Sequence, residues 1–251
     1  MTDPRHFYDR LAGAYHLIFE DWEQSIARQS AALARILERW LPQPGLVLDA
    51  AAGIGTQLLG FAAHGFRMVG SDISVEALHR ASSEVASREL VASFVAADFR
   101  ALPFRSGWAD AVIACDNALP HLMSIAEIAS AMREMARCVR PGGGVVISVR
   151  DYVPQPTGTQ QTVPYGEREW EGRRYHVEQE WEWHGRFYNL RLRIRSLEGE
   201  PESVADVQTS YFAVSIPELL DVMRTVGLVD VQRLDGVYYQ PLLIGTVSHA
   251  A

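Results

Sequence analysis

The chain has 251 residues, of which 48% are hydrophobic and 22% charged, so it can bury one large core. Its formal net charge of -8 leaves no surplus of Lys and Arg to neutralise phosphates, and we expect no nucleic-acid partner. Cys115 and Cys138 lack zinc-ligand spacing, so we expect no metal site and two reduced thiols. No apolar run approaches the ~20 residues that cross a bilayer, which predicts no membrane partner and a cytoplasmic location.

The first three fifths of the chain alternate between helix and strand signals. Residues 6–41 carry apolar side chains at helical spacing, which predicts one or two N-terminal helices. Ser124 and Glu127 are spaced as a capping box, and Pro141 with the neighbouring glycines is expected to end that helix. The further helices are expected at 55–64, 74–90 and 124–139, and the strands at 45–50, 67–72, 92–98, 109–116 and 144–149.

The pattern changes after about residue 155, where residues 172–196 alternate with period two and predict a hairpin. If His184 and Gly185 form a two-residue type I′ turn, Glu178 lies opposite Arg191. A helix over 215–228 and strands over 229–234 and 238–247 are expected to close the fold.

Short strands alternating with helices predict an α/β fold with a doubly wound, Rossmann-like, mostly parallel sheet of seven strands. We expect a single domain with an N-terminal helical lid and an antiparallel β insertion. Its expected parts are N-terminal helices over 1–41, a cofactor-binding core over 42–152, a β-rich substrate insertion over 153–213, and a closing helix and strands over 214–251.

The stretch "LVLDAAAGIGTQLLG" (46–60) predicts a strand that ends at Asp49 and a glycine turn that leads into a helix. Gly53 and Gly55 would let backbone N–H groups and the positive helix end face a ligand. A dinucleotide fingerprint needs a third small residue where Leu58 stands, which disfavours a nicotinamide-dependent oxidoreductase. Asp72 ends the next strand, so acidic groups gather at the ligand-binding edge of the sheet.

Four motifs, "VLDAAAGIGT", "VGSDIS", "AADFRALPF" and "DAVIACDNALPHL", resemble those of class I S-adenosylmethionine (SAM)-dependent methyltransferases, over essentially the whole chain. The family's first motif usually reads D-x-G-x-G-x-G, so Ala51 replaces its first glycine, which is tolerable if φ there is negative. The resemblance implies SAM as cofactor and S-adenosylhomocysteine as product. It further implies that Gly53 and Gly55 line the methionine part, that Asp49 organises the turn and the ammonium, and that Asp72 binds the ribose. Asp98 would bind the adenine amino group and Phe99 would pack on the ring. The remaining expected cofactor-binding residues are Ala51, Ile73 and Cys115.

Two stretches are similar to glycine, sarcosine and dimethylglycine N-methyltransferases, namely "CDNALPHL" (115–122) and "VRDY" (149–152). The likeness implies that Arg150 binds the acceptor's carboxylate and that Asn117 assists binding and catalysis. A guanidinium at a strand end suits a carboxylate, and pairing of Arg150 with Asp151 or another acid is the alternative. For a hydroxyl or carbon acceptor, His121 is the nearest candidate base, against a packing role.

The N-terminal "YDRLAGAYHLIFEDWEQSIAR" resembles the helices that fold over the cofactor in that branch. This implies that Tyr8 contacts the substrate side, that Tyr15 lies against the cofactor and that Arg28 meets its carboxylate, with ordinary helix packing as the alternative. Ile18 stands near the place of the branch's substrate-facing tyrosine, so glycine itself is not the expected substrate. The hairpin and the aromatics Tyr211, Tyr238 and Tyr239 are expected to wall a larger pocket.

The sequence therefore predicts a SAM-dependent methyltransferase that acts on a small molecule, with N-methylation of an amine or amino acid as the favoured reaction. The alternatives are O- or C-methylation of a natural product and a SAM-binding module without catalysis. The acceptor, the number of methyl groups and the oligomeric state, a homo-oligomer included, stay open.

Overall fold

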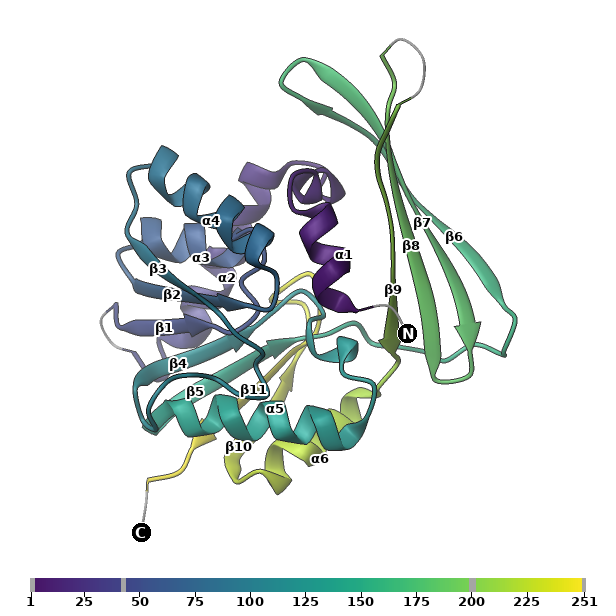
Figure 1. The fold of residues 1–251 in the computed structure, drawn as a ribbon. Coiled ribbons are helices and arrows are strands. Elements are labelled where there is room, and N and C mark those ends of the chain that lie inside the picture. Colours follow the sequence, from purple (N-terminus) through teal and green to yellow (C-terminus); the bar gives the residue numbers. More distant parts are fainter. Residues whose placement is uncertain (1–2, 42–43, 199–201, 250–251) are drawn as a thin grey trace.

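The computed structural model describes residues 3–41, 44–198 and 202–249, so the expected domain boundary between 41 and 42 lies outside the described residues. It contains a seven-stranded sheet of order β10-β11-β5-β4-β1-β2-β3 and a four-stranded sheet of order β6-β7-β8-β9 (Figure 1). The expected mostly parallel Rossmann-like sheet with an antiparallel β insertion is confirmed.

In the larger sheet β1 to β5 are parallel, and β11 pairs antiparallel with both β5 and β10. The strands are β1 Leu46–Asp49, β2 Arg67–Asp72, β3 Ala92–Ala96, β4 Ala109–Ala114, β5 Val139–Ser148, β10 Leu228–Leu234 and β11 Leu242–Val247. One expectation was wrong, because Pro141 and its glycines lie inside β5 and do not end the preceding helix. These glycines make room for neighbours, since a Cβ on Gly144 would lie 2.2 Å from the ring of Trp40.

The helices are α1 Pro4–Leu11, α2 Trp22–Leu37, α3 Thr56–Ala63, α4 Val75–Ser87, α5 Ile125–Cys138 and α6 Ile216–Thr225, with short 3-10 helices η1 Tyr15–Ile18 and η2 Leu119–His121. Apolar stripes of α2, α3 and α4 cover one face of the large sheet, and those of α5 and α6 cover the other. The expected capping box of α5 forms only in part. Ser124 Oγ accepts from the N–H of Glu127 at 3.2 Å, but the Glu127 carboxylate accepts from the N–H of Met123 and not from that of Ser124.

The four-stranded sheet consists of β6 Gln160–Trp170, β7 Arg173–His184, β8 Phe187–Ser196 and β9 Ser203–Phe212, so the expected hairpin is extended by a strand on each side. The expected turn was wrong by one residue, because His184 pairs with Phe187 and leaves Gly185 and Arg186 as the turn. Gly185 has a φ of +66°, whereas Arg186 has no positive φ, so the type I′ geometry is not formed. Glu178 consequently lies opposite Arg193, and the side chains keep their expected faces.

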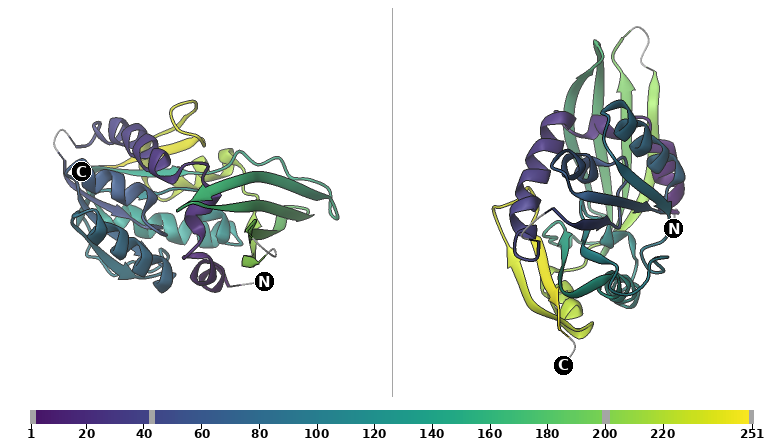
Figure 2. Two further views of the ribbon diagram at one scale, coloured as in Figure 1. Left: turned by 90° about the horizontal axis from the view of Figure 1, so that it is seen from above. Right: turned by 90° about the vertical axis from the view of Figure 1, so that its left-hand side faces the viewer.

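The N-terminal segment, which comprises α1 and η1, lies between the two sheets. Helix α1 contacts β9 on one side and α4 on the other, and η1 contacts β6 and β7. The four-stranded sheet projects from the side of the α/β core in the left view of Figure 2, with this segment at the junction. Asp9 of α1 accepts a hydrogen bond from Ser74 Oγ, the N-cap of α4, at 2.6 Å. The segment is therefore positioned to cover the carboxyl edge of the large sheet.

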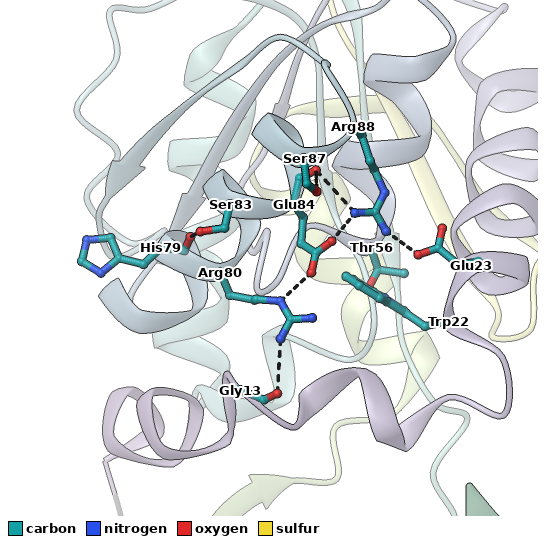
Figure 3. Close-up of polar contacts among 10 residues, drawn as sticks. All are labelled: Gly13, Trp22, Glu23, Thr56, His79, Arg80, Ser83, Glu84, Ser87 and Arg88. Carbon is teal, nitrogen blue, oxygen red and sulfur yellow. Dashed lines mark hydrogen bonds and ion pairs between the residues drawn. The ribbon is translucent and has the colours of Figure 1, made fainter. Parts of the chain in front are cut away.

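Helix α4 holds this segment with two arginines (Figure 3). Arg80 donates to the carbonyl of Gly13 at 3.3 Å and pairs with Glu84 at 2.6 Å, while Arg88 contacts both Glu84 and Glu23. Both guanidinium groups lie over the ring of Trp22, at 5.8 and 5.5 Å from its centroid. This arrangement fixes the start of α2 against the core.

Candidate functional site

The carboxyl ends of the parallel strands meet beneath the N-terminal segment, which is where open α/β sheets bind ligands. A cavity of about 230 Å³ lies at the glycine loop, and one of about 740 Å³ lies between the N-terminal helices, the four-stranded sheet and the loop before β11. Among the described residues, Tyr8, Tyr15 and Asp116 line both. The two cavities therefore meet at these three side chains.

The glycine loop between β1 and α3 has the backbone that the sequence predicts. Gly53 and Gly55 have φ values of +52° and +92°, in the left-handed region that glycine adopts most easily. A Cβ on Gly53 would lie 3.6 Å from the ring of Tyr15, so the loop and the N-terminal segment approach closely. Ala51 is not among the residues with positive φ, which confirms that alanine fits at this position.

Asp49 lies behind this loop and lines neither cavity. Its Oδ1 accepts from the N–H of Ala51 at 3.3 Å, and its buried Oδ2 has no hydrogen-bond partner among the described residues. Burial raises the pKa of this carboxyl to about 8. Its one hydrogen-bond contact among the described residues is with the loop backbone, so Asp49 holds the turn and lies outside both cavities.

The smaller cavity gathers most of the expected cofactor residues. Asp72 accepts from the N–H of Gly53 at 2.8 Å and from that of Ser74 at 2.9 Å, and burial raises its pKa. Asp98 also lines this cavity and pairs with Arg100 at 2.6 Å. Its lining further includes Ala51, Gly53, Ile73, Phe99 and Cys115. Three expected residues lie elsewhere, because Asp49 and Gly55 line neither cavity and the exposed Arg28 lines the larger one.

His121 lines the smaller cavity but not the larger one. Its Nε2 lies 2.8 Å from the hydroxyl of Tyr8, and its Nδ1 lies 3.4 Å from Oγ1 of Thr209. Its ring packs 4.2 Å from that of Tyr211, measured between centroids. Burial lowers the pKa of His121 to about 3, so the imidazole is neutral near pH 7.

Arg150 follows β5 and points into the larger cavity. Its Nη1 is buried without a partner among the described residues, Nη2 donates to the hydroxyl of Tyr165 at 3.4 Å, and the guanidinium lies 4.9 Å from the ring of Trp181. Pairing with Asp151, the alternative from the sequence, is not found, because Asp151 pairs with Arg233 at 2.7 Å.

Asn117 is buried next to Arg150 and also lines the larger cavity. Its Oδ1 accepts from the backbone N–H of Arg150 at 3.1 Å, and its Nδ2 donates to the hydroxyl of Tyr152 at 2.5 Å. Both ends of the Asn117 amide are thus hydrogen-bonded to residues 150 and 152, which holds the backbone at Arg150 in place.

The sequence reasoning missed Asp116, although it stands inside the quoted motif "CDNALPHL". It accepts hydrogen bonds from the hydroxyls of Tyr238 and Tyr239, which line the larger cavity as expected for its wall. No cluster of three metal-ligating side chains occurs within 3–41, 44–198 and 202–249. None of the helices described there is long and apolar enough to span a membrane.

Residues 47–143 match the family model described as a methyltransferase domain. The ubiquinone/menaquinone biosynthesis C-methyltransferase UbiE of Syntrophotalea carbinolica is 29% identical over 147 residues, which is 58% of this chain and 60% of that protein. The chain spans about half to three fifths of the length of the first curated relatives that it matches.

Solved structures resemble nearly the whole chain. SAM-bound CalS10, an amino pentose methyltransferase from Micromonospora echinaspora, has a TM-score of 0.74 and 19% identity and covers 94% of this chain and 95% of its own. The sugar N-methyltransferase KedS8 from Streptoalloteichus sp. has a TM-score of 0.76 and 18% identity, with 94% and 93% covered. Residues 47–143 therefore match a methyltransferase domain, and nearly the whole chain, the β insertion included, has the fold of these methyltransferase structures. The glycine N-methyltransferase branch is not confirmed.

Proposed function

We propose that the protein is a SAM-dependent methyltransferase that methylates an amine nitrogen of a small molecule bearing an anionic group. The observation that carries this proposal is the pair of cavities that meet at Tyr8, Tyr15 and Asp116. One cavity lies at the glycine loop of the methyltransferase domain, and the other contains the guanidinium of Arg150.

In this proposal the smaller cavity holds SAM. Asp72 binds the ribose hydroxyls, Phe99 packs on the adenine, and the loop at Gly53 faces the methionine part. Bound SAM supplies a methyl group on a positively charged sulfur, which an acceptor attacks in line. The chain's own contribution is to hold the acceptor against that methyl group and to exclude water, which can lower the barrier by about 7–11 kcal/mol.

The larger cavity holds the acceptor, and Arg150 recognises its anionic group. Arg150 lines this cavity and its neighbour Asp151 is paired with Arg233, so its guanidinium is available for charge-assisted hydrogen bonds to a carboxylate or phosphate. Asn117 positions Arg150 and contacts no acceptor atom in this scheme. Ile18 lines the same cavity of about 740 Å³, which exceeds what glycine fills, so we propose a larger acceptor.

An amine is favoured as the acceptor atom because an unprotonated amine needs no base, whereas a hydroxyl or a carbon acid does. His121 has both ring nitrogens near other side chains and lines only the cofactor cavity, so we propose that it positions Tyr8. The relative named as a ubiquinone/menaquinone C-methyltransferase favours C-methylation of a quinone precursor as the alternative.

The test is release of S-adenosylhomocysteine from SAM with matched acceptors, in which each amine is compared with its analogue that lacks the anionic group. The panel includes glycine, sarcosine, dimethylglycine, bulkier amino acids, amino sugars with and without phosphate, phenols and quinols. Turnover restricted to anionic amines supports the proposal. Turnover of phenols or quinols alone replaces it with O- or C-methylation, and SAM binding without turnover of any acceptor favours a non-catalytic module.

A further inference from the structure

Asp116 lies where the two cavities meet, and its backbone has an unfavourable conformation. It follows β4, and both Asp116 and Asn117 have positive φ, +57° and +67°, which costs free energy in residues other than glycine. The N–H of Asp116 donates to Ser148 Oγ at 2.7 Å. The contact with Ser148 therefore helps to hold the Asp116 side chain at the junction, although the positive φ costs free energy.

One oxygen of this carboxylate is engaged, and the other faces the junction. Oδ1 accepts from the hydroxyl of Tyr239 at 2.5 Å and from that of Tyr238 at 3.0 Å, while the described residues give Oδ2 no hydrogen bond. Oδ2 is also not among the buried atoms without a partner, so it is open to the cavities. Burial raises the pKa of Asp116, although its tyrosine and Gln57 neighbours lower it.

The side chains around Oδ2 favour a positive charge. Tyr8 and Tyr15 line the same junction, and tyrosine rings attract cations through their faces. Arg150 lines the same larger cavity and carries the opposite charge. An acceptor with an amine at one end and an anionic group at the other thus enters in one orientation, with its nitrogen at Asp116.

We propose, on the basis of the proposed function, that Asp116 is the residue that binds the acceptor nitrogen at the point of methyl transfer. Oδ2 accepts a hydrogen bond from an N–H of the neutral amine, which directs the nitrogen lone pair at the methyl carbon. The nitrogen–carbon bond forms as the carbon–sulfur bond breaks, and the electron pair of that bond returns to sulfur. The positive charge that develops on nitrogen lies beside Asp116, and the product ammonium loses its extra proton to water.

The test uses two ligands that need no known acceptor and that differ at the transfer point, where one is uncharged and the other carries an ammonium group. S-adenosylhomocysteine is neutral at sulfur, whereas sinefungin carries a primary ammonium on the carbon that replaces the methylsulfonium. We expect calorimetry to show that the wild-type protein prefers sinefungin. Asp116→Asn should lower the affinity for sinefungin by about 10- to 100-fold, the range for a charge-assisted hydrogen bond, and leave the affinity for S-adenosylhomocysteine unchanged.

Asparagine suits this comparison because it keeps the shape of the side chain and tolerates positive φ. Asp151→Asn is the matched control, an exposed acid that lines neither cavity, and it should change neither affinity. A wild-type protein that binds both ligands without preference, or an equal loss of both in Asp116→Asn, overturns this inference alone. A wild-type protein that binds neither ligand overturns the proposed function as well.

Discussion

Replacing Arg150 by methionine is expected to stabilise the protein when no acceptor is bound. The guanidinium is enclosed in the larger cavity, its Nη1 has no partner among the described residues, and Asp151 is already paired with Arg233. A buried charge without a counterion costs several kcal/mol, and replacement of buried ionic groups by apolar ones is often stabilising by about 1–4 kcal/mol. Methionine keeps an unbranched apolar stem against Trp181.

The gain is reduced by the lost stacking of Arg150 on Trp181, whose ring centroid lies 4.9 Å from the guanidinium. That contact contributes about 1 kcal/mol, so we expect a net rise of about 0–3 kcal/mol in the free energy of unfolding. For a chain of this size each kcal/mol corresponds to about 2–4 °C in Tm. The same substitution should raise the KM for an anionic acceptor about 100-fold, with unchanged affinity for SAM.

The assay is thermal unfolding of both proteins without ligand, followed by chemical denaturation to obtain the free energy. Arg186→Met is the control, because Arg186 also stacks on a ring, that of Phe212 at 4.7 Å, but is paired with Glu218. It should lose stability slightly. If Arg150→Met instead lowers Tm by several degrees, the guanidinium has a structural role and the reasoning about the acceptor fails.

Three other substitutions test the site and the fold. Asp72→Ala should weaken SAM binding by about 2–3 kcal/mol, because it removes the ribose acceptor and frees the N–H of Gly53, and a near-native calorimetric Kd would contradict the site map. His16 is buried without hydrogen-bond partners among the described residues, and burial lowers its pKa to about 4. In the unfolded chain the His16 imidazole takes up a proton near pH 6.5, well before it does so in the folded protein. The free energy of unfolding of the wild type should therefore fall relative to that of His16→Phe between about pH 6.5 and 4, by up to about 1.4 kcal/mol per pH unit. A constant difference between the two proteins across that range would refute this. Gly144→Ala should destabilise the protein by about 1–3 kcal/mol, because its Cβ would meet the Trp40 ring at 2.2 Å, and an unchanged midpoint in urea would count against that packing.

The parts of the fold that could be predicted from the sequence are those in which buried apolar residues recur at a regular spacing. Strands β1 and β4 are short and mostly apolar, and the glycine loop follows β1, so their positions and that of the loop could be predicted. Strand β6 could not be predicted, because most of its side chains are at least partly exposed and Pro164 and Gly166 flank a register shift. Without one buried face, the period-two signal is lost.

The site was predictable where it depends on strand ends and unpredictable where it depends on distant segments. The carboxyl edge of a parallel sheet follows from the order of elements, which placed Asp72 and Arg150 correctly at that edge. Asp116 depends on Ser148, Tyr238 and Tyr239, which the fold brings to it from other parts of the chain. Asp and Asn tolerate positive φ, but their presence at 116 and 117 does not by itself specify that conformation.

The strand order also has a consequence for synthesis on the ribosome. One edge of β5 is covered by β11, and the whole four-stranded sheet is translated between those two strands. At about 5–20 residues per second, the nascent chain holds an apolar strand edge unpaired for roughly 5–20 s. We expect ribosome-stalled chains that end before Leu242 to be cleaved by protease within the core, and chains that expose β11 through Val247 to resist. Equal resistance of both would show that strands β1 to β5 are stable before β11 pairs with β5.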